Sequence, residues 1–99
     1  MKEVIKQLDK AFENRIRLGI MSVLMTEESI TFNDLKSALE LTDGNLASHL
    51  KALEKKQYVE VEKKFVGRKP NTTYRATKMG KKAFRNHLEA LEKLIAGNH

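Results

Sequence analysis

Two short helical patterns joined by a tight connection constrain the fold of this chain more than any other feature of its sequence. Thr31 precedes the first pattern, and Asp34 follows three residues later, a spacing close to that of a capping box. Thr42 precedes the second helix, which we expect over residues 43–56. The apolar residues of its inner side recur at helical spacing and are Leu46, Leu50 and Leu53. Two short helices with so brief a connection are typical of a helix-turn-helix.

A pattern that predicts a β-hairpin follows the second helix. Apolar and polar side chains largely alternate over residues 59–65, as they do in a half-exposed strand. Gly67 and Pro70 interrupt this alternation, so we expect a turn of about four to six residues before a second strand at residues 72–76. Residues 29–31 are partly β-branched and are a candidate for a short third strand that pairs with the hairpin.

The N-terminal region is expected to form two helices. The first covers residues 2–12, and the apolar residues on one of its faces are Ile5, Leu8 and Phe12. Asn14 is a candidate cap for the second helix. Gly19 inside that second helix costs about 1 kcal/mol relative to alanine, which indicates that another helix approaches closely at this point.

The last helix is expected to begin after Thr77 and to run to about residue 96. Its apolar residues form a seam at spacings of four, three and four residues, as in a coiled coil, namely Phe84, Leu88, Leu91 and Ile95. The expected fold is therefore mainly α with a small β-hairpin, in the order α-α-(β)-α-α-β-β-α, within a single domain over residues 1–99.

Composition excludes several classes of protein. The ninety-nine residues contain no cysteine, which excludes disulfides, thiolate metal sites and thiol redox switches. His49, His87 and His99 are scattered along the chain, so no metal site is expected. No apolar run approaches the roughly 18 residues of a membrane span, and the charged N-terminus has no signal-peptide core. We expect a cytoplasmic protein that does not engage membranes.

Positive charge is concentrated in the middle of the chain. Residues 42–87 carry twelve Lys or Arg and four Asp or Glu, a net charge of +8. Residues 1–41 and residues 88–99 each have a net charge of −1. A polyanion such as double-stranded DNA is the partner that this distribution favours, although a basic surface can also serve solubility alone.

The outer side of the helix at residues 43–56 carries the first group of candidate DNA contacts. These residues are Asn45, Ser48, His49, Lys51, Ala52 and Lys55. Asparagine pairs bidentately with adenine, serine serves several bases, and an alanine methyl can meet the methyl of thymine. His49 also suggests a pH-dependent contact, because the charge of histidine changes near neutrality. The alternative is a solvated amphipathic helix whose polar side binds nothing.

The hairpin carries a second group of candidate DNA contacts over residues 63–73. Its cations are Lys63, Lys64, Arg68 and Lys69. Arginine at the tip of a hairpin can enter a narrow minor groove, whose negative potential attracts cations. Pro70 stiffens the turn and so reduces the entropy lost on docking. The alternative is a charged turn that is polar only because it is exposed.

The chain resembles the stand-alone winged-helix transcriptional regulators of bacteria and archaea, near the MarR and ArsR groups. The match runs over roughly residues 9–90, and its five segments occur in the family's order. They are residues 15–21, 32–35, 41–54, 67–74 and 77–84. The resemblance implies a dimer with a recognition helix in the major groove and a wing near the minor groove. Many ArsR-type members sense metals through Cys, His or carboxylate ligands, and the lack of cysteine here argues against that activity.

Both end segments, residues 1–12 and 77–96, carry apolar stripes beyond the central motif, so we expect a two-fold homodimer. The candidate interface residues are Ile5, Leu8, Phe12, Phe84, Leu88, Leu91 and Ile95. The alternative is that all of them belong to the core of one chain. Two recognition helices in such a dimer would lie about 34 Å apart, which matches inverted half-sites one helical turn apart.

The sequence therefore predicts a sequence-specific DNA-binding regulator, a homodimeric repressor of a promoter with an inverted-repeat operator. No cofactor is expected, and any small-molecule effector is unknown. An enzyme is not expected, because the chain has no phosphate-binding glycine loop, metal-ligand cluster or nucleophile–base pair. The rival hypothesis is a winged-helix module that binds protein and leaves DNA alone.

Overall fold

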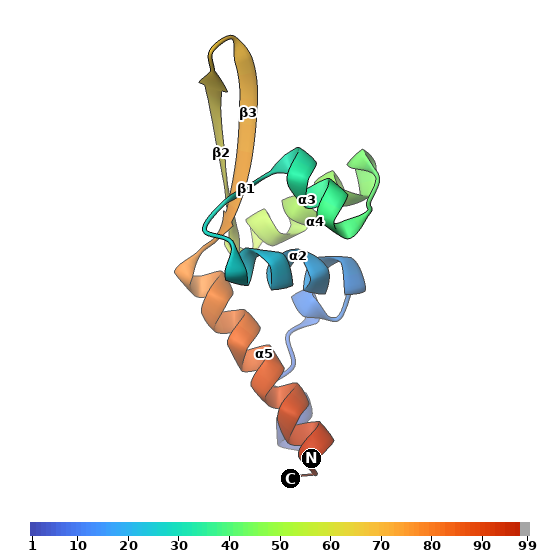
Figure 1. Cartoon of the computed structure of the whole chain (residues 1–99). Coiled ribbons are helices and arrows are strands. Elements are labelled where there is room, and N and C mark those ends of the chain that lie inside the picture. Colours follow the sequence, from blue (N-terminus) through green and yellow to red (C-terminus); the bar gives the residue numbers. More distant parts are fainter. Residues whose placement is uncertain (98–99) are drawn as a thin grey trace.

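A computed structural model describes residues 1–97, and His99, one of the three histidines, lies outside them (Figure 1). The helices and strands follow the expected order, and their bounds are α1 Lys2–Ile5, the 3₁₀ helix η1 Lys10–Phe12, α2 Arg15–Thr26, β1 Ile30–Thr31, α3 Phe32–Leu39, α4 Asp43–Lys55, β2 Val59–Val66, β3 Lys69–Ala76 and α5 Lys78–Ala96. The expected fold, mainly helical with an antiparallel hairpin, is confirmed.

Each of the four longer helices begins at a side chain that caps it. Asn14 accepts hydrogen bonds from the backbone N–H groups of Ile16 and Arg17 at the start of α2. Thr31, Thr42 and Thr77 accept in the same way at the starts of α3, α4 and α5. All four caps agree with the sequence-based predictions. Such caps satisfy N–H groups that a helix leaves unpaired, which explains why helix starts were readable from the sequence.

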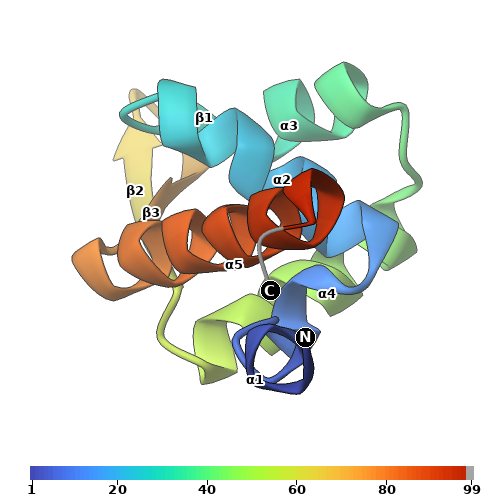
Figure 2. The ribbon, with the colours of Figure 1, turned by 90° about the horizontal axis from the view of Figure 1, so that it is seen from below.

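The core forms where α2 crosses the helix-turn-helix and the base of the hairpin. Its buried residues are Ala11, Phe12, Ile20, Met21, Leu24, Leu35, Leu46, Leu50, Leu53, Val59 and Phe84. Gly19 lies at the approach of α2 to α3, where an added Cβ would be 3.3 Å from the Leu39 side chain. The close helix approach expected at this glycine is therefore confirmed. Figure 2, which is a view from below, shows α5 in front of α2, with which it is in contact.

The sheet has three antiparallel strands in the order β1-β3-β2. β1 pairs with β3 through Ile30 opposite Tyr74 and Thr31 opposite Thr73, so the short third strand is confirmed. The predicted turn was too long, because Val66 pairs with Lys69 and only two residues connect the strands. Gly67, with φ of 66°, takes the first of these positions, as in a type II′ turn.

Pro70 therefore lies inside β3 rather than in the turn, opposite Phe65. A proline lacks the N–H that a strand donates, so it is tolerated only where one edge of the strand is unpaired. β1 pairs with β3 only at Thr73 and Tyr74, which leaves that edge free at Pro70. The incomplete third strand explains how a proline fits into the strand that is central in the sheet.

The prediction of one helix over residues 2–12 was wrong. α1 ends at Ile5, and Asp9 has extended backbone dihedrals and caps η1 through Ala11 N–H. Tertiary contacts hold Asp9 in place, because it accepts a hydrogen bond from the Tyr58 hydroxyl at 2.7 Å and its N–H donates to His87 Nδ1 at 3.0 Å. These partners lie 49 and 78 residues away in sequence, so local periodicity did not indicate the break.

The inner face of α5 also differs from the expected seam. Its buried residues are Gly80, Phe84, His87 and Ala90, whereas the side chains of Leu88 and Ile95 are 42% and 85% exposed. His87 is buried against the Phe12 ring. Phe12 and Phe84 pack edge to face at 5.1 Å within the core, which removes both from the surface available to a second copy.

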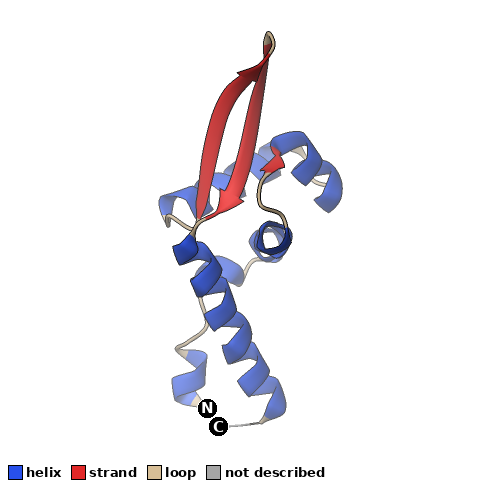
Figure 3. Ribbon diagram, turned by 60° about the vertical axis from the view of Figure 1, so that its left-hand side comes forward, coloured by secondary structure: helices blue, strands red, loops and turns tan. Residues whose placement is uncertain are grey.

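The molecule is elongated, with extents of 55 × 25 × 21 Å. The hairpin projects at one end, and the outer half of α5 projects at the other with α1 beside it (Figures 1 and 3). We call this second projection, formed by α1 and residues 88–96, the stem. α2 lies between the stem and the pair of helices α3 and α4. None of the helices in residues 1–97 has the length and apolar character needed to cross a membrane.

Candidate nucleic-acid interface

The recognition helix α4 presents the polar face that the sequence predicted. Leu46, Leu50 and Leu53 are buried against the core. Asn45, Ser48, Lys51 and Lys55 are exposed, while His49 and Ala52 are partly buried at its borders. The exposed Asn45 and Ser48 stand in the first two turns, the part of such a helix that reaches base edges. The free N–H groups and positive dipole end of this helix start also favour phosphate.

Arg17 of α2 holds His49 against the rest of the protein. The Arg17 Nη1 lies 3.1 Å from His49 Nδ1, and its Nε donates to Ala11 O at 2.7 Å. A guanidinium can only donate, so Nδ1 of His49 accepts and carries no proton in this arrangement. The remaining ring N–H, at Nε2, is then a donor. In this arrangement His49 can donate through Nε2 to a base acceptor or a phosphate, and the pH-dependent contact considered from the sequence stays a prediction.

The wing is the hairpin of β2 and β3, and its cations lie toward the tip. Lys63, Lys64, Arg68 and Lys69 are all exposed. Lys64 pairs with Glu62 at 3.1 Å, but both side chains are more than half exposed, so this ion pair is weak. Within residues 1–97, no carboxylate lies within 4.0 Å of the other three cations. Three of the four are therefore available to an external anion.

The base of the wing is anchored in the protein. Tyr74 of β3 packs against Phe32 of α3, with ring centroids 6.3 Å apart. Burial, and to a lesser extent the charge of Glu54, raises the pKa of the Tyr74 hydroxyl above its ordinary value. Tyr58, which immediately precedes β2, stacks on Phe12 at 5.5 Å. These aromatic contacts fix the direction of the wing relative to α3 and η1.

The part of the hairpin nearer its base, where Glu60 and Glu62 lie, has the opposite electrostatic character. Glu60 pairs with Arg75 across the strands at 2.8 Å, and Glu28 and Glu54 line an open cavity of about 510 Å³ beside them. Among residues 1–97 no group of three His, Asp or Glu side chains is arranged to hold a metal ion. Carboxylates therefore gather away from the wing tip, which separates acidic from basic surface.

Sequence reasoning missed two residues at this surface. Arg17 gave no signal, because nothing local indicates that its side chain reaches a helix 32 residues further along the chain. Phe65 was expected on a half-exposed strand, but its side chain is 72% exposed at the outer part of the wing. The length of the hairpin would have indicated this exposure, since β1 pairs with β3 only near the base of the hairpin and leaves its outer part uncovered.

Three comparisons bear on this surface. A family model described as a winged helix DNA-binding domain matches residues 16–95. An uncharacterised protein of Methanocaldococcus jannaschii is 39% identical over 79 residues, which are 80% of this chain and 86% of that protein. The structure of a transcriptional regulator homologue from Pyrococcus horikoshii OT3 has a TM-score of 0.86 at 32% identity, covering 97% of this chain and 93% of that one.

The S. aureus MepR–DNA complex has a TM-score of 0.74 and covers 98% of this chain and 82% of that one, but at 16% identity it shows the fold alone. A capped recognition helix beside a basic hairpin defines a winged helix-turn-helix. Because the family model matches residues 16–95, which are most of the chain, the chain belongs to the winged helix DNA-binding domain family. The resemblance drawn from the sequence is thereby confirmed.

Proposed function

We propose that this protein is a homodimeric repressor that binds an inverted-repeat operator. α4 would enter the major groove and read bases through Asn45 and Ser48, while His49 and Ala52 line the border of the same surface. Lys51, Lys55 and the wing cations would contact phosphates. The observation that carries this proposal is the exposed positive charge of the wing, where three of the four cations have no carboxylate of residues 1–97 within 4.0 Å, beside a recognition helix whose outer face is polar.

The proposed dimer would form through the stem and the adjoining Leu8. Ile5, Leu88 and Ile95 are 55%, 42% and 85% exposed, while Leu8 and Leu91 are partly buried. Phe12 and Phe84 belong to the core of one chain, so the remaining five residues of the predicted interface would make the contact. The stem lies across α2 from α4 (Figure 1). Pairing there would leave both recognition helices free to bind successive half-sites, as a two-fold axis requires.

The first experiment compares binding of the protein to its own upstream DNA with binding to a scrambled duplex, over a range of salt concentrations. Tight binding that prefers the upstream duplex and weakens with salt is expected. Each phosphate contact steepens the slope of log K against log salt by about 0.9. An Asn45→Ala/Ser48→Ala variant should lose the preference while keeping the slope, because base contacts specify and phosphate contacts position. Absence of binding at low salt would refute the proposal and favour the protein-interaction module.

The oligomeric state is tested separately by sedimentation of Leu88→Glu and Ile95→Glu variants. Both should shift the protein toward the monomer, because a carboxylate would be buried at the interface without a partner. Asn86→Glu is the matched control, since it places the same charge on an exposed position of α5 outside the apolar stripe. If the wild-type protein sediments as a monomer at micromolar concentration, the proposed dimer is refuted, while the proposal of DNA binding is unaffected.

A further inference from the structure

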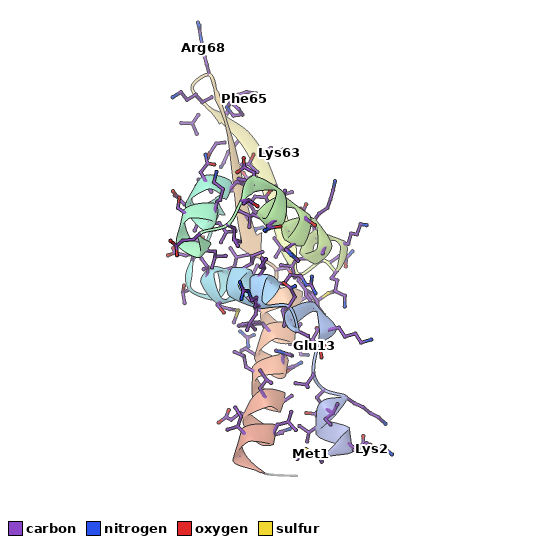
Figure 4. The ribbon with its side chains drawn as sticks, turned by 90° about the vertical axis from the view of Figure 1, so that its right-hand side faces the viewer. Met1, Lys2, Glu13, Lys63, Phe65 and Arg68 are labelled. Carbon is purple, nitrogen blue, oxygen red and sulfur yellow. The ribbon has the colours of Figure 1, made fainter. Side chains whose placement is uncertain are left out.

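The outer part of the wing carries apolar side chains that the fold does not use. Phe65 and Val66 are 72% and 65% exposed, and Pro70 lies directly opposite Phe65. Every residue of β2 from Glu62 onward is exposed, so the body of the protein does not cover this segment. Figure 4 shows Phe65 and Arg68 at the outer end of the hairpin, beyond Lys63. A single exposed apolar residue is common, but here the apolar residues occupy the part that projects furthest.

Cations surround these apolar side chains on both faces of the ribbon. Lys63 shares a face with Phe65, because side chains alternate along a strand. Lys69 lies opposite Val66 on the other face, which also carries Lys64 and its ion-pair partner Glu62. Arg68 follows in the turn, and Lys69 begins the returning strand. A groove of duplex DNA has a phosphate backbone on each side. A ribbon with positive charge on both faces and an apolar tip therefore matches a groove better than it matches a flat acidic protein surface.

We infer that the wing tip is a wedge, in which Phe65 enters the minor groove and packs against sugars and base edges while the flanking cations hold the two backbones. This inference rests on the proposed DNA binding and deepens it. An undistorted minor groove is about 6 Å wide, which is too narrow for two strands. Entry of the tip therefore widens the groove, and apolar wedges that do so bend the duplex.

The wedge makes a contribution to affinity that charge does not make. Burial of an apolar side chain releases no counterions, so its effect does not depend on salt, in contrast to phosphate contacts. Truncation of Phe65 should therefore weaken binding by the same factor at every salt concentration. From the transfer free energy of a phenylalanine side chain, we expect binding at least about tenfold weaker. Truncation of Arg68 should instead flatten the salt slope by about 0.9.

The experiment uses a duplex selected from random-sequence DNA by the purified wild-type protein. Affinities of Phe65→Ala, Arg68→Ala and wild type are measured by fluorescence anisotropy across salt, and bending is measured by energy transfer between dyes at the duplex ends. Phe65→Ala should bind about tenfold more weakly with an unchanged slope and a smaller bend. Met79→Ala is the matched control, because Met79 is 53% exposed but lies at the start of α5. Phe65→Leu should retain part of the affinity.

The outcomes separate the wedge from DNA binding itself. Equal affinity and bending for wild type and Phe65→Ala, with binding still weakened in Asn45→Ala/Ser48→Ala, overturn the wedge and leave the proposed function standing. Failure of the wild-type protein to select or bind any duplex overturns both. Thermal unfolding of Phe65→Ala should match that of the wild type, since the side chain has no contact with the buried core, and this excludes misfolding as the cause of weaker binding.

Discussion

Replacement of Tyr58 by phenylalanine tests how strongly the base of the wing is fastened to the N-terminal segment. The Tyr58 hydroxyl donates a hydrogen bond of 2.7 Å to Asp9 Oδ2, and the ring stacks on Phe12 with centroids 5.5 Å apart. Phenylalanine retains the ring and removes only the hydroxyl. The variant therefore isolates one hydrogen bond that joins residues 49 positions apart.

A hydrogen bond to a charged acceptor contributes about 1.5–3 kcal/mol to stability. Asp9 would keep two other partners in the variant, the Ala11 N–H at 2.9 Å and the more distant Lys56 ammonium at 3.9 Å. The carboxylate is then not left unpaired, so we expect the lower end, about 1.5 kcal/mol. A chain of this size loses about 4–8 °C in Tm per kcal/mol, so the expected decrease is about 6–12 °C.

The same contact predicts a difference between the two proteins at alkaline pH. Burial first, then the hydrogen bond to Asp9 and the charge of Asp9, raise the pKa of Tyr58 from 10.0 to about 12. The raised pKa favours the neutral phenol in the folded state. This stabilisation is therefore complete below pH 10 and is lost as the pH rises toward 12. Tyr58→Phe has no hydroxyl to titrate, so its stability relative to wild type should recover over this window.

Thermal unfolding is measured by circular dichroism at pH 7.5 and at one protein concentration, because association makes Tm depend on concentration. Denaturant unfolding between pH 9.5 and 11.5 gives the alkaline comparison. Tyr74→Phe is the control. The pKa of Tyr74 is raised by burial and by the charge of Glu54, and not by a hydrogen bond. The reasoning would be refuted if the Tm of Tyr58→Phe lay within 2 °C of the wild-type value and both proteins lost the same stability at alkaline pH. The hydroxyl would then contribute nothing to stability.

Three further experiments test two other contacts and one strained backbone position. Gly80→Ala should destabilise the protein by about 3 kcal/mol in denaturant unfolding, because the new Cβ would overlap the Tyr58 backbone carbonyl, which cannot move aside. Gly44→Ala is its control and should be neutral or stabilising, since no atom lies within 4 Å of the added Cβ. A double-mutant cycle of Arg17→Met and His49→Ala should give a coupling of at least about 0.5 kcal/mol, and additivity would contradict the contact. Gln57→Gly should stabilise by about 0.5–1 kcal/mol, because Gln57 has φ of 64°; a lower denaturant midpoint would argue against relief of backbone strain.

The parts of the fold that depend on neighbouring residues could be predicted from the sequence. Asn14, Thr31, Thr42 and Thr77 mark helix starts because a short polar side chain satisfies backbone N–H groups two or three residues later. The leucines of α4 likewise form its buried side because their spacing follows the helical repeat. Local chemistry and tertiary structure agree at these positions.

Two of the errors, the helix over residues 2–12 and the buried face of α5, occurred where a distant contact decides the conformation. The apolar pattern of residues 2–12 fits a helix, yet Asp9 interrupts it because Tyr58 and His87 both bond to it. In α5, Gly80 and His87 lie on the buried face, which no count of apolar residues would find. His87 is buried because its ring packs on Phe12 and its Nδ1 accepts from Asp9 N–H, a partner that only the folded chain supplies.

The same distant contacts connect the two ends of the molecule. η1 touches the base of the wing through Asp9 and Tyr58, and it touches α5 through Asp9 and His87. Ala11 of η1 accepts a hydrogen bond from Arg17, whose guanidinium also meets His49 of the recognition helix. A rearrangement of the stem that displaced η1 would have to break bonds to α5, to the wing and to Arg17 together. The N-terminal segment, which was predicted from the sequence to be a dimerisation helix, thus holds α4 and the wing in place.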